Sequence, residues 1–114
     1  MMNLELKLFD VIVVPFPFTD RNATKRRPAL VMSSAAFNTT TQHSVLAMIT
    51  SADQSRWPGD LPISDLESAG LASDCLVRLK IFTLDHRLIV RKAGTLAAMD
   101  QKKLRSEWKT LLLA

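Results

Sequence analysis

Three consecutive cationic side chains lie immediately before a proline in the first third of the sequence. The run is Lys25-Arg26-Arg27-Pro28, at the junction of a polar loop and an apolar segment. A proline favours an extended backbone in the residue before it, so we expect Arg27 to project in a defined direction. A guanidinium held in this way can bind a phosphate through two hydrogen bonds and stabilise charge on its oxygens. A solvated loop is the alternative for this motif taken alone.

Two adjacent hydroxyl groups end another apolar segment, at Ile49-Thr50-Ser51. A hydroxyl at the end of a strand can bond a phosphate oxygen or a ribose hydroxyl. It can equally satisfy the backbone of its own turn, and by itself this motif favours that interpretation.

A third group of residues has the composition of a surface that binds single-stranded nucleic acid. Arg78 and Lys80 alternate with apolar residues, and Arg56 and Trp57 occur in a preceding loop. Such binding needs cations that follow the phosphate backbone and an aromatic ring on which a base can stack. Trp57 can also be a core residue or a dimer contact, and this alternative stays open.

The two histidines deserve attention because a histidine pair can serve as general acid and base. His43 lies in a threonine-rich loop, and His86 follows a turn-like Leu84-Asp85. Neither has an evident partner in the sequence, so we expect neither to be catalytic.

Length and composition limit the number of domains and the cofactors that the chain can bind. A chain of 114 residues forms one domain with one core, without needing disulfide or metal staples. The single Cys75 has no partner for a disulfide and no Cys/His spacing for zinc, so we expect neither a metal nor another cofactor. A net charge of +4 and a pI near 9.6 permit an anionic partner without proving one.

Targeting and membrane signals are not evident in the sequence. The first eight residues alternate apolar and charged side chains, unlike a signal peptide, and no stretch reaches the roughly 18 apolar residues of a membrane span. We therefore expect a soluble, cytoplasmic protein without membrane contact.

Short β-branched and aromatic segments separated by turn formers predict a mainly β fold. We expect strands over residues 10–18, 28–33, 45–51, 61–63 and 74–82, and a further strand over 86–91. Pro15 and Pro17 lack a ladder donor and should lie at a strand end or edge. Strand alternation should place Arg78 and Lys80 on a wet face, with Ile81 on the opposite face.

The carboxyl-terminal segment predicts one amphipathic helix from about residue 97 to residue 113. It has no Gly or Pro, and its apolar residues recur at helical spacing. Several strands followed by a helix define an α+β, mainly β domain whose strands close into a small barrel. An apolar edge strand and the Leu111-Leu112-Leu113 end leave surface to cover, which predicts a twofold homodimer.

Four stretches, residues 9–20, 25–31, 49–51 and 77–84, occur in the order and with the motifs of one known family. Through them the chain resembles the PemK/MazF family of growth-inhibiting toxins over nearly its whole length. The resemblance implies one toxin domain over residues 1–114 and an SH3-like barrel with a carboxyl-terminal helix. It also implies a homodimer, and a small cognate antitoxin that occupies the groove in which the toxins of this family bind RNA.

The resemblance further implies a metal-independent endoribonuclease, an mRNA interferase, that cleaves single-stranded RNA by attack of a ribose 2′-hydroxyl. Arg27 and Thr50 match the family residues that act at the scissile phosphate. The substrate-binding candidates are Lys25, Arg26, Ser51, Arg56, Trp57, Arg78, Lys80, Thr19 and Asp20. A non-catalytic binder of RNA or of a protein target is the alternative, and a purely structural interaction domain is a third.

The sequence departs from the family pattern at three positions. Phe9 replaces the Gly that usually precedes the first strand's Asp, and the neighbours of Lys80 are apolar where some relatives carry an acid or amide. The second departure leaves the general acid and base unassigned. Ala97 stands at the usual helix-cap position, with Thr95 as a substitute cap.

Overall fold

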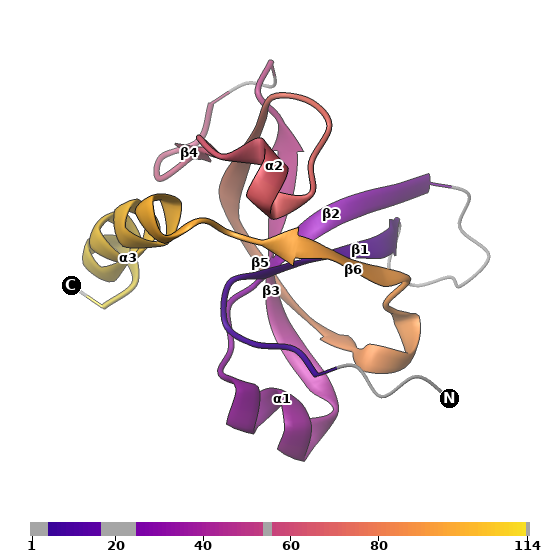
Figure 1. Cartoon of the computed structure of the whole chain (residues 1–114). Helices are drawn as coiled ribbons and strands as arrows, with labels where there is room; N and C mark the ends of the chain where they lie inside the picture. The colour runs from indigo at the N-terminus through magenta and orange to yellow at the C-terminus, as the bar shows by residue number, and fades with distance from the viewer. Residues whose placement is uncertain (1–4, 17–24, 54–55, 114) are drawn as a thin grey trace.

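The computed structural model describes residues 5–16, 25–53 and 56–113. Within them, six strands form one antiparallel, strongly curled sheet in the order β4-β5-β3-β2-β1-β6, and α3 follows at the carboxyl end (Figure 1). The elements are β1 (Asp10–Phe16), β2 (Lys25–Val31), α1 (Ala35–Thr41), β3 (His43–Ser51), β4 (Leu61–Pro62), α2 (Leu66–Ala69), β5 (Cys75–Asp85), the 3-10 helix η1 (His86–Leu88), β6 (Arg91–Thr95) and α3 (Ala98–Leu113). The predicted mainly β fold with a carboxyl-terminal helix is confirmed, as a half-barrel.

Each face of the sheet carries its own apolar cluster, because successive residues of a strand point to opposite faces. On one face Val11, Leu30 and Ile49 pack with Leu104 and Trp108 of α3. The other cluster consists of Leu6, Ile12, Val14, Ala29, Val31, Leu46, Leu84 and Ile89. The second face, which α3 leaves uncovered, is the one that continues toward the candidate site.

Helix α3 is held to the segments on either side of β4 by polar contacts as well as by apolar packing. The indole Nε1 of Trp108 donates to the carbonyl oxygen of Gly59 at 2.9 Å. The carboxylate of Asp100 accepts the backbone N–H groups of Ser64 and Asp65 at 3.0 to 3.1 Å. No helix in the described part of the chain is long and apolar enough to cross a membrane.

The turn into β1 has a left-handed backbone at Phe9, with φ of 76°. Only glycine adopts this conformation without steric cost, so a phenylalanine here is strained. The Phe9 ring is buried in the first cluster, and the guanidinium of Arg105 lies 4.9 Å from its centroid. Asp10, fully buried, accepts from the Lys7 N–H, the Thr95 hydroxyl and, at 3.2 Å, the Lys92 ammonium. These contacts hold the strained turn in place.

The Thr95 hydroxyl therefore donates a hydrogen bond to the Asp10 carboxylate, at 3.0 Å. The prediction that Thr95 caps the carboxyl-terminal helix is wrong, because the buried carboxylate is the stronger acceptor for this hydroxyl. The sequence offered no sign of this pair, whose members lie 85 residues apart.

Strand β2 begins three residues earlier than predicted, at Lys25 instead of Pro28. Its first three residues pair with β1, with Val14 opposite Arg27 and Phe16 opposite Lys25. Pro15 is tolerated in β1 because the pairing with β6 ends at Val13, so no ladder bond is lost there. Pro15 thus lies near the end of β1, on a stretch that β6 does not pair, which confirms the predicted strand end or edge. Pro17 lies outside the described residues.

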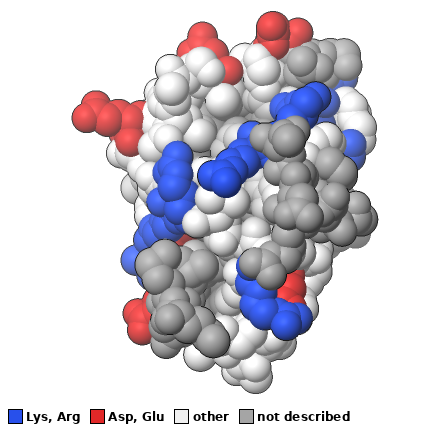
Figure 2. All heavy atoms as spheres, turned by 90° about the vertical axis from the view of Figure 1, so that its right-hand side faces the viewer, with Lys and Arg blue, Asp and Glu red and all other residues white. Residues whose placement is uncertain are grey.

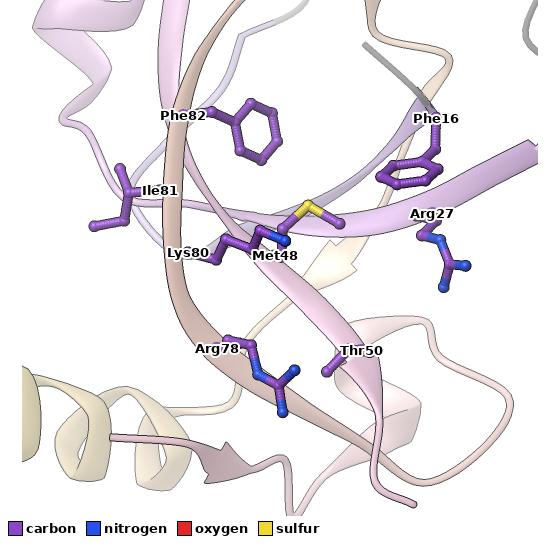
Figure 3. Close-up of a pocket in the computed structure, with 8 residues that line it drawn as sticks. All are labelled: Phe16, Arg27, Met48, Thr50, Arg78, Lys80, Ile81 and Phe82. Atoms are coloured by element: carbon purple, nitrogen blue, oxygen red, sulfur yellow. The ribbon is translucent and has the colours of Figure 1, made fainter. Parts of the chain in front are cut away.

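Strand β5 contains an irregularity in its pairing with β3. Ala47 pairs with Ile81 while Met48 pairs with Arg78, so two residues of β5 have no partner in β3 between them. Because two residues are inserted and not one, the alternation of faces is kept. Ile81 shares its face with Val77 and Leu79, as predicted, and Figure 3 shows its side chain on the other side of β5 from Lys80. At this end of the strand that face is not covered, since the Ile81 side chain is 43% exposed.

The strand predicted over residues 86–91 is wrong except at its last residue. Residues 86–88 form η1, and β6 begins only at Arg91. Asp85 causes the turn, since its carboxylate accepts the backbone N–H of Arg87 at 2.9 Å and binds the Arg87 guanidinium. The hydrogen bonds from Arg87 hold the pKa of the Asp85 carboxyl at about 2.

His86 is buried beside Ser44, whose hydroxyl lies 2.8 Å from Nε2, while its Nδ1 has no hydrogen-bond partner among the described residues. Burial, and secondarily the nearby His43, lowers the pKa of His86 below its ordinary 6.5. The unfolded chain therefore binds a proton more readily than the folded chain.

We predict that the free energy of unfolding is undiminished by this group above pH 6.5 and falls as the pH drops from 6.5 toward the lowered pKa. One proton limits the slope to about 1.4 kcal/mol per pH unit. Urea unfolding between pH 7.5 and 5.0 measures it, with His86→Gln as the non-titrating control. Equal pH dependence in parent and variant would contradict the prediction.

Candidate functional site

One groove collects side chains from β1, β2, β3 and β5 on the uncovered face of the sheet (Figure 3). Its volume is about 360 Å³. The lining residues are Phe16, Arg27, Met48, Thr50, Arg78, Lys80, Ile81 and Phe82. The groove thus contains three cationic side chains and one hydroxyl, and its other lining residues are apolar or aromatic.

The register of β2 and β3 explains why Arg27 and Thr50 line the same groove. Ala29 lies opposite Met48, so the residues two positions further along each strand, Arg27 and Thr50, point to the same face. The pairing of the two strands ends at Ala29 and Met48. Beyond that point Arg27 and Thr50 are not paired across the two strands, and both side chains line the groove.

Arg27 is half-buried and its guanidinium lies 5.1 Å from the centroid of the Phe16 ring. A cation over an aromatic face is attracted to it and loses rotational freedom. Among the residues that the structure describes, no carboxylate lies within ion-pair distance of Arg27. Arg27 is therefore oriented by an uncharged contact, and its positive charge is not neutralised by that part of the chain.

Arg78, in contrast, is paired with a carboxylate. Its Nε and Nη2 donate to the two oxygens of Asp60 at 3.2 and 3.0 Å, and both side chains are largely buried. Burial by itself raises the pKa of Asp60, but hydrogen bonds from Arg78 and from the Trp57 backbone N–H outweigh it and lower that pKa. Asp60 is thus ionised at neutral pH and compensates most of the charge of Arg78.

Trp57 lies outside the lining of the groove, and its exposed ring contacts two of the lining cations. The Arg78 guanidinium lies 5.1 Å from its ring centroid and the Lys80 ammonium 5.9 Å. The backbone N–H of Trp57 donates to Asp60 at 2.8 Å, which fixes the turn that carries the ring. Asp60 therefore orients both the cation and the aromatic surface beside it.

The remaining sequence candidates lie outside this lining. Lys25 and Arg26 are exposed at the start of β2, and Arg26 lines a separate hollow on the opposite face. The Ser51 hydroxyl is bonded to Asp53, and Arg56 is exposed near Asp60. Thr19 and Asp20 fall outside the described residues.

Both histidines lie away from the groove, His43 in a 3.8 Å contact with Asp85 and His86 against Ser44. Within residues 5–16, 25–53 and 56–113, no cluster of His, Cys, Asp or Glu could hold a metal ion. Sequence reasoning missed Asp60, whose Trp-Pro-Gly-Asp context signalled a turn but not an ion pair. It also missed Phe16 and Phe82, which were assigned only to strands.

The chain is thus a mainly β protein, a small curled sheet whose uncovered face carries a cationic, partly apolar groove. The sequence profile of the PemK-like, MazF-like toxins of type II toxin-antitoxin systems matches residues 7–112. The chain belongs to this family. A search of curated proteins finds no match.

Solved structures with the same fold come from related toxins. MazF of Deinococcus radiodurans is 21% identical with a TM-score of 0.74, covering 98% of this chain and 100% of that chain. A MazE-MazF complex from the same organism is 20% identical with a TM-score of 0.73, covering 96% and 97%. A mycobacterial endoribonuclease in complex with its cognate antitoxin is 17% identical with a TM-score of 0.72, covering 94% of each chain. At these identities the likeness establishes the fold.

We predict that Asp60 and Arg78 stabilise the folded chain as a coupled pair. A double-mutant cycle of Asp60→Ala and Arg78→Ala, followed by urea unfolding, should give a coupling energy of about 1 to 3 kcal/mol. The reason is that removing either partner leaves the other charge largely buried without its hydrogen bonds. Additive effects of the two substitutions would contradict this account of the pair.

Proposed function

We propose that this chain is a metal-independent endoribonuclease that cleaves single-stranded RNA, acting as the toxin of a toxin-antitoxin pair. The observation that carries the proposal is that Arg27 and Thr50 line one groove, on the same face of adjacent strands. Family membership supports the same activity, as does the mycobacterial structural relative described as an endoribonuclease.

In the proposed reaction the RNA supplies its own nucleophile. The ribose 2′-oxygen attacks the adjacent phosphorus and loses its proton, and the bond to the 5′-oxygen breaks. That oxygen gains a proton, so the products are a 2′,3′-cyclic phosphate and a free 5′-hydroxyl. The protein must orient the strand, stabilise the charge on the phosphorane and assist proton transfer.

Arg27 has the geometry for charge stabilisation, because its guanidinium is oriented by Phe16 and has no carboxylate partner among the described residues. Thr50 supplies a hydroxyl from the neighbouring strand that can orient the attacked phosphate. Lys80 is exposed and borders the same groove, so it can hold a neighbouring phosphate. Apolar walls lower the local dielectric and strengthen each of these interactions.

Trp57 and Arg78 form the proposed surface for a neighbouring base. A base can stack on the half-exposed indole, and stacking on aromatic side chains contributes about 1 to 3 kcal/mol per base. Arg78 contributes less net charge than Arg27 or Lys80 because Asp60 compensates it. Its planar guanidinium, 5.1 Å from the indole centroid, supports the ring instead.

A non-catalytic binding protein is the second candidate, and one observation favours it. In the described lining of the groove there is no histidine and no carboxylate to transfer a proton. A chain with this lining can retain RNA affinity, or bind a protein target, without cleavage. Incubation with end-labelled RNA in EDTA separates the two functions, because cyclic-phosphate ends form only with the nuclease.

We also propose that the chain forms a homodimer. Leu111, Leu112 and Leu113 at the end of α3 are 44% to 81% exposed, and Met99 at its start is 60% exposed. The last two leucines border a second, mainly apolar groove with Leu8, Phe9 and Met32. Apolar surface of this kind is commonly covered by a second copy of the chain.

A cognate antitoxin is the second proposed protein partner. Its proposed binding site is the RNA groove, because a peptide seated there would exclude the strand from Arg27 and Thr50. The two relatives that are described as toxin-antitoxin complexes support this partner.

We predict that Arg27→Ala lowers the cleavage rate at saturating RNA by about 100- to 1000-fold, because it removes the group that stabilises the phosphorane. Thr50→Val, which keeps the shape but removes the hydroxyl, should lower it about tenfold. The measurement is single-turnover cleavage of a single-stranded oligonucleotide in EDTA. Lys103→Ala, an exposed cation of α3 outside both grooves, is the matched control. Parent-like rates for both groove variants would overturn the assignment.

A further inference from the structure

A second cationic hollow lies on the opposite face of β2, where α2 and the turn after it approach β6. We call it the β2–β6 hollow; its volume is about 430 Å³. Its lining consists of Val13, Arg26, Arg27, Pro28, Gly70, Leu71, Ala72, Ser73, Cys75, Arg91 and Ala93. Arg27 is the one residue that it shares with the groove containing Thr50.

The strand register brings Arg26 and Arg91 to the same face. Arg26 pairs with Pro15, while Val13 pairs with both Pro28 and Arg91. Val13 and Pro15 are two residues apart in β1 and point to one face, so their partners do too. The backbones of β2 and β6 lie about 10 Å apart across β1, a separation that two arginine side chains can bridge around one phosphate.

The charges in this hollow are uncompensated by the described part of the chain. Neither Arg26 nor Arg91 has a carboxylate within ion-pair distance there, and no Asp or Glu belongs to the lining. The acidic pair Asp53 and Asp74 borders a separate depression beyond Ser73. On the face where β2 and β6 begin, Lys and Arg side chains gather while most Asp and Glu lie at the rim (Figure 2).

The wall opposite the arginines is fixed by close backbone packing. Gly70 has φ of 72°, and a Cβ at this position would lie 2.1 Å from the carbonyl oxygen of Ala93. A Cβ at Gly94 would lie 2.4 Å from the carbonyl oxygen of Ser68. Two glycines thus allow α2 and its following turn to sit directly on β6. The hollow is preformed, so binding there does not require the wall to be ordered first.

We propose that the β2–β6 hollow is a second phosphate subsite for the same RNA strand, with Arg26 and Arg91 as its ligands. The RNA strand leaves the groove at Arg27, passes the end of the sheet where β2 begins and places a flanking phosphate between these two arginines. Two consecutive arginines of β2 then serve the two faces of the sheet, Arg27 at the scissile phosphate and Arg26 at the flanking one. This subsite rests on the proposed function, since its ligand is the RNA that the groove cleaves.

The test measures how binding depends on salt. The probe is a mixed-sequence single strand of about 12 nucleotides with 2′-O-methyl riboses, which cannot be cleaved because the nucleophile is blocked. Removing one phosphate-binding cation should make the slope of log K against log salt shallower by about 0.7. We expect this change, with about three- to tenfold weaker binding at low salt, for Arg91→Gln.

Two control variants and two further measurements make the outcome specific to this subsite. Arg91→Lys keeps the charge and should restore most of the slope, while Lys103→Gln removes one exposed positive charge elsewhere and should keep the parent slope. On a cleavable RNA of the same length, Arg91→Gln should raise KM with little change in kcat. Thermal unfolding checks that the exposed substitution leaves the fold intact.

Two results overturn the proposal without touching the nuclease assignment. One is a parent that cleaves RNA together with an Arg91→Gln variant of unchanged slope and KM. The other is an equal loss in Lys103→Gln, which would make net charge alone the cause. A parent that neither binds nor cleaves RNA overturns the proposed function, and the subsite with it.

Discussion

The pairing of β2 with β3 is the constraint on which the site depends. Ala29 opposite Met48 sets the phase of both strands, and a slip of one residue would turn either Arg27 or Thr50 to the other face. The apolar clusters prevent such a slip, because Ala29 and Leu30 are completely buried on opposite faces. The packing that stabilises the sheet therefore also sets the geometry of the groove.

The charges at the groove are divided between two tasks. Arg78 is held by Asp60 and supports Trp57, so it shapes the surface while contributing little net charge. Arg27 has only the Phe16 ring as an orienting contact among the described residues, and its charge remains available to an anion. An arginine paired with a carboxylate and an arginine over an aromatic ring are both well oriented, but only the second keeps its electrostatic field.

Much of the architecture and part of the site follow from sequence patterns. The strands around residues 10–16, 28–31 and 45–51 and the helix from 98 to 113 were predictable because period-2 and period-3.6 burial are local signals. Arg27 and Thr50 were singled out by local chemistry, a cation before a proline and a hydroxyl at a strand end. The bulge at Leu79 and Lys80, the η1 turn and the early start of β2 were not predictable, since each depends on a partner strand or on Asp85.

The sequence by itself determined which side chains carry charge, which strand and helix periods they follow and which family the chain resembles. Only the tertiary structure decided that Asp60 neutralises Arg78, that Arg26 faces away from Arg27 toward Arg91, and that Phe9 adopts a left-handed backbone. The physical reason is distance along the chain. Ion pairs, cross-strand registers and strained turns are stabilised by residues tens of positions away, and no local pattern records which of them will meet.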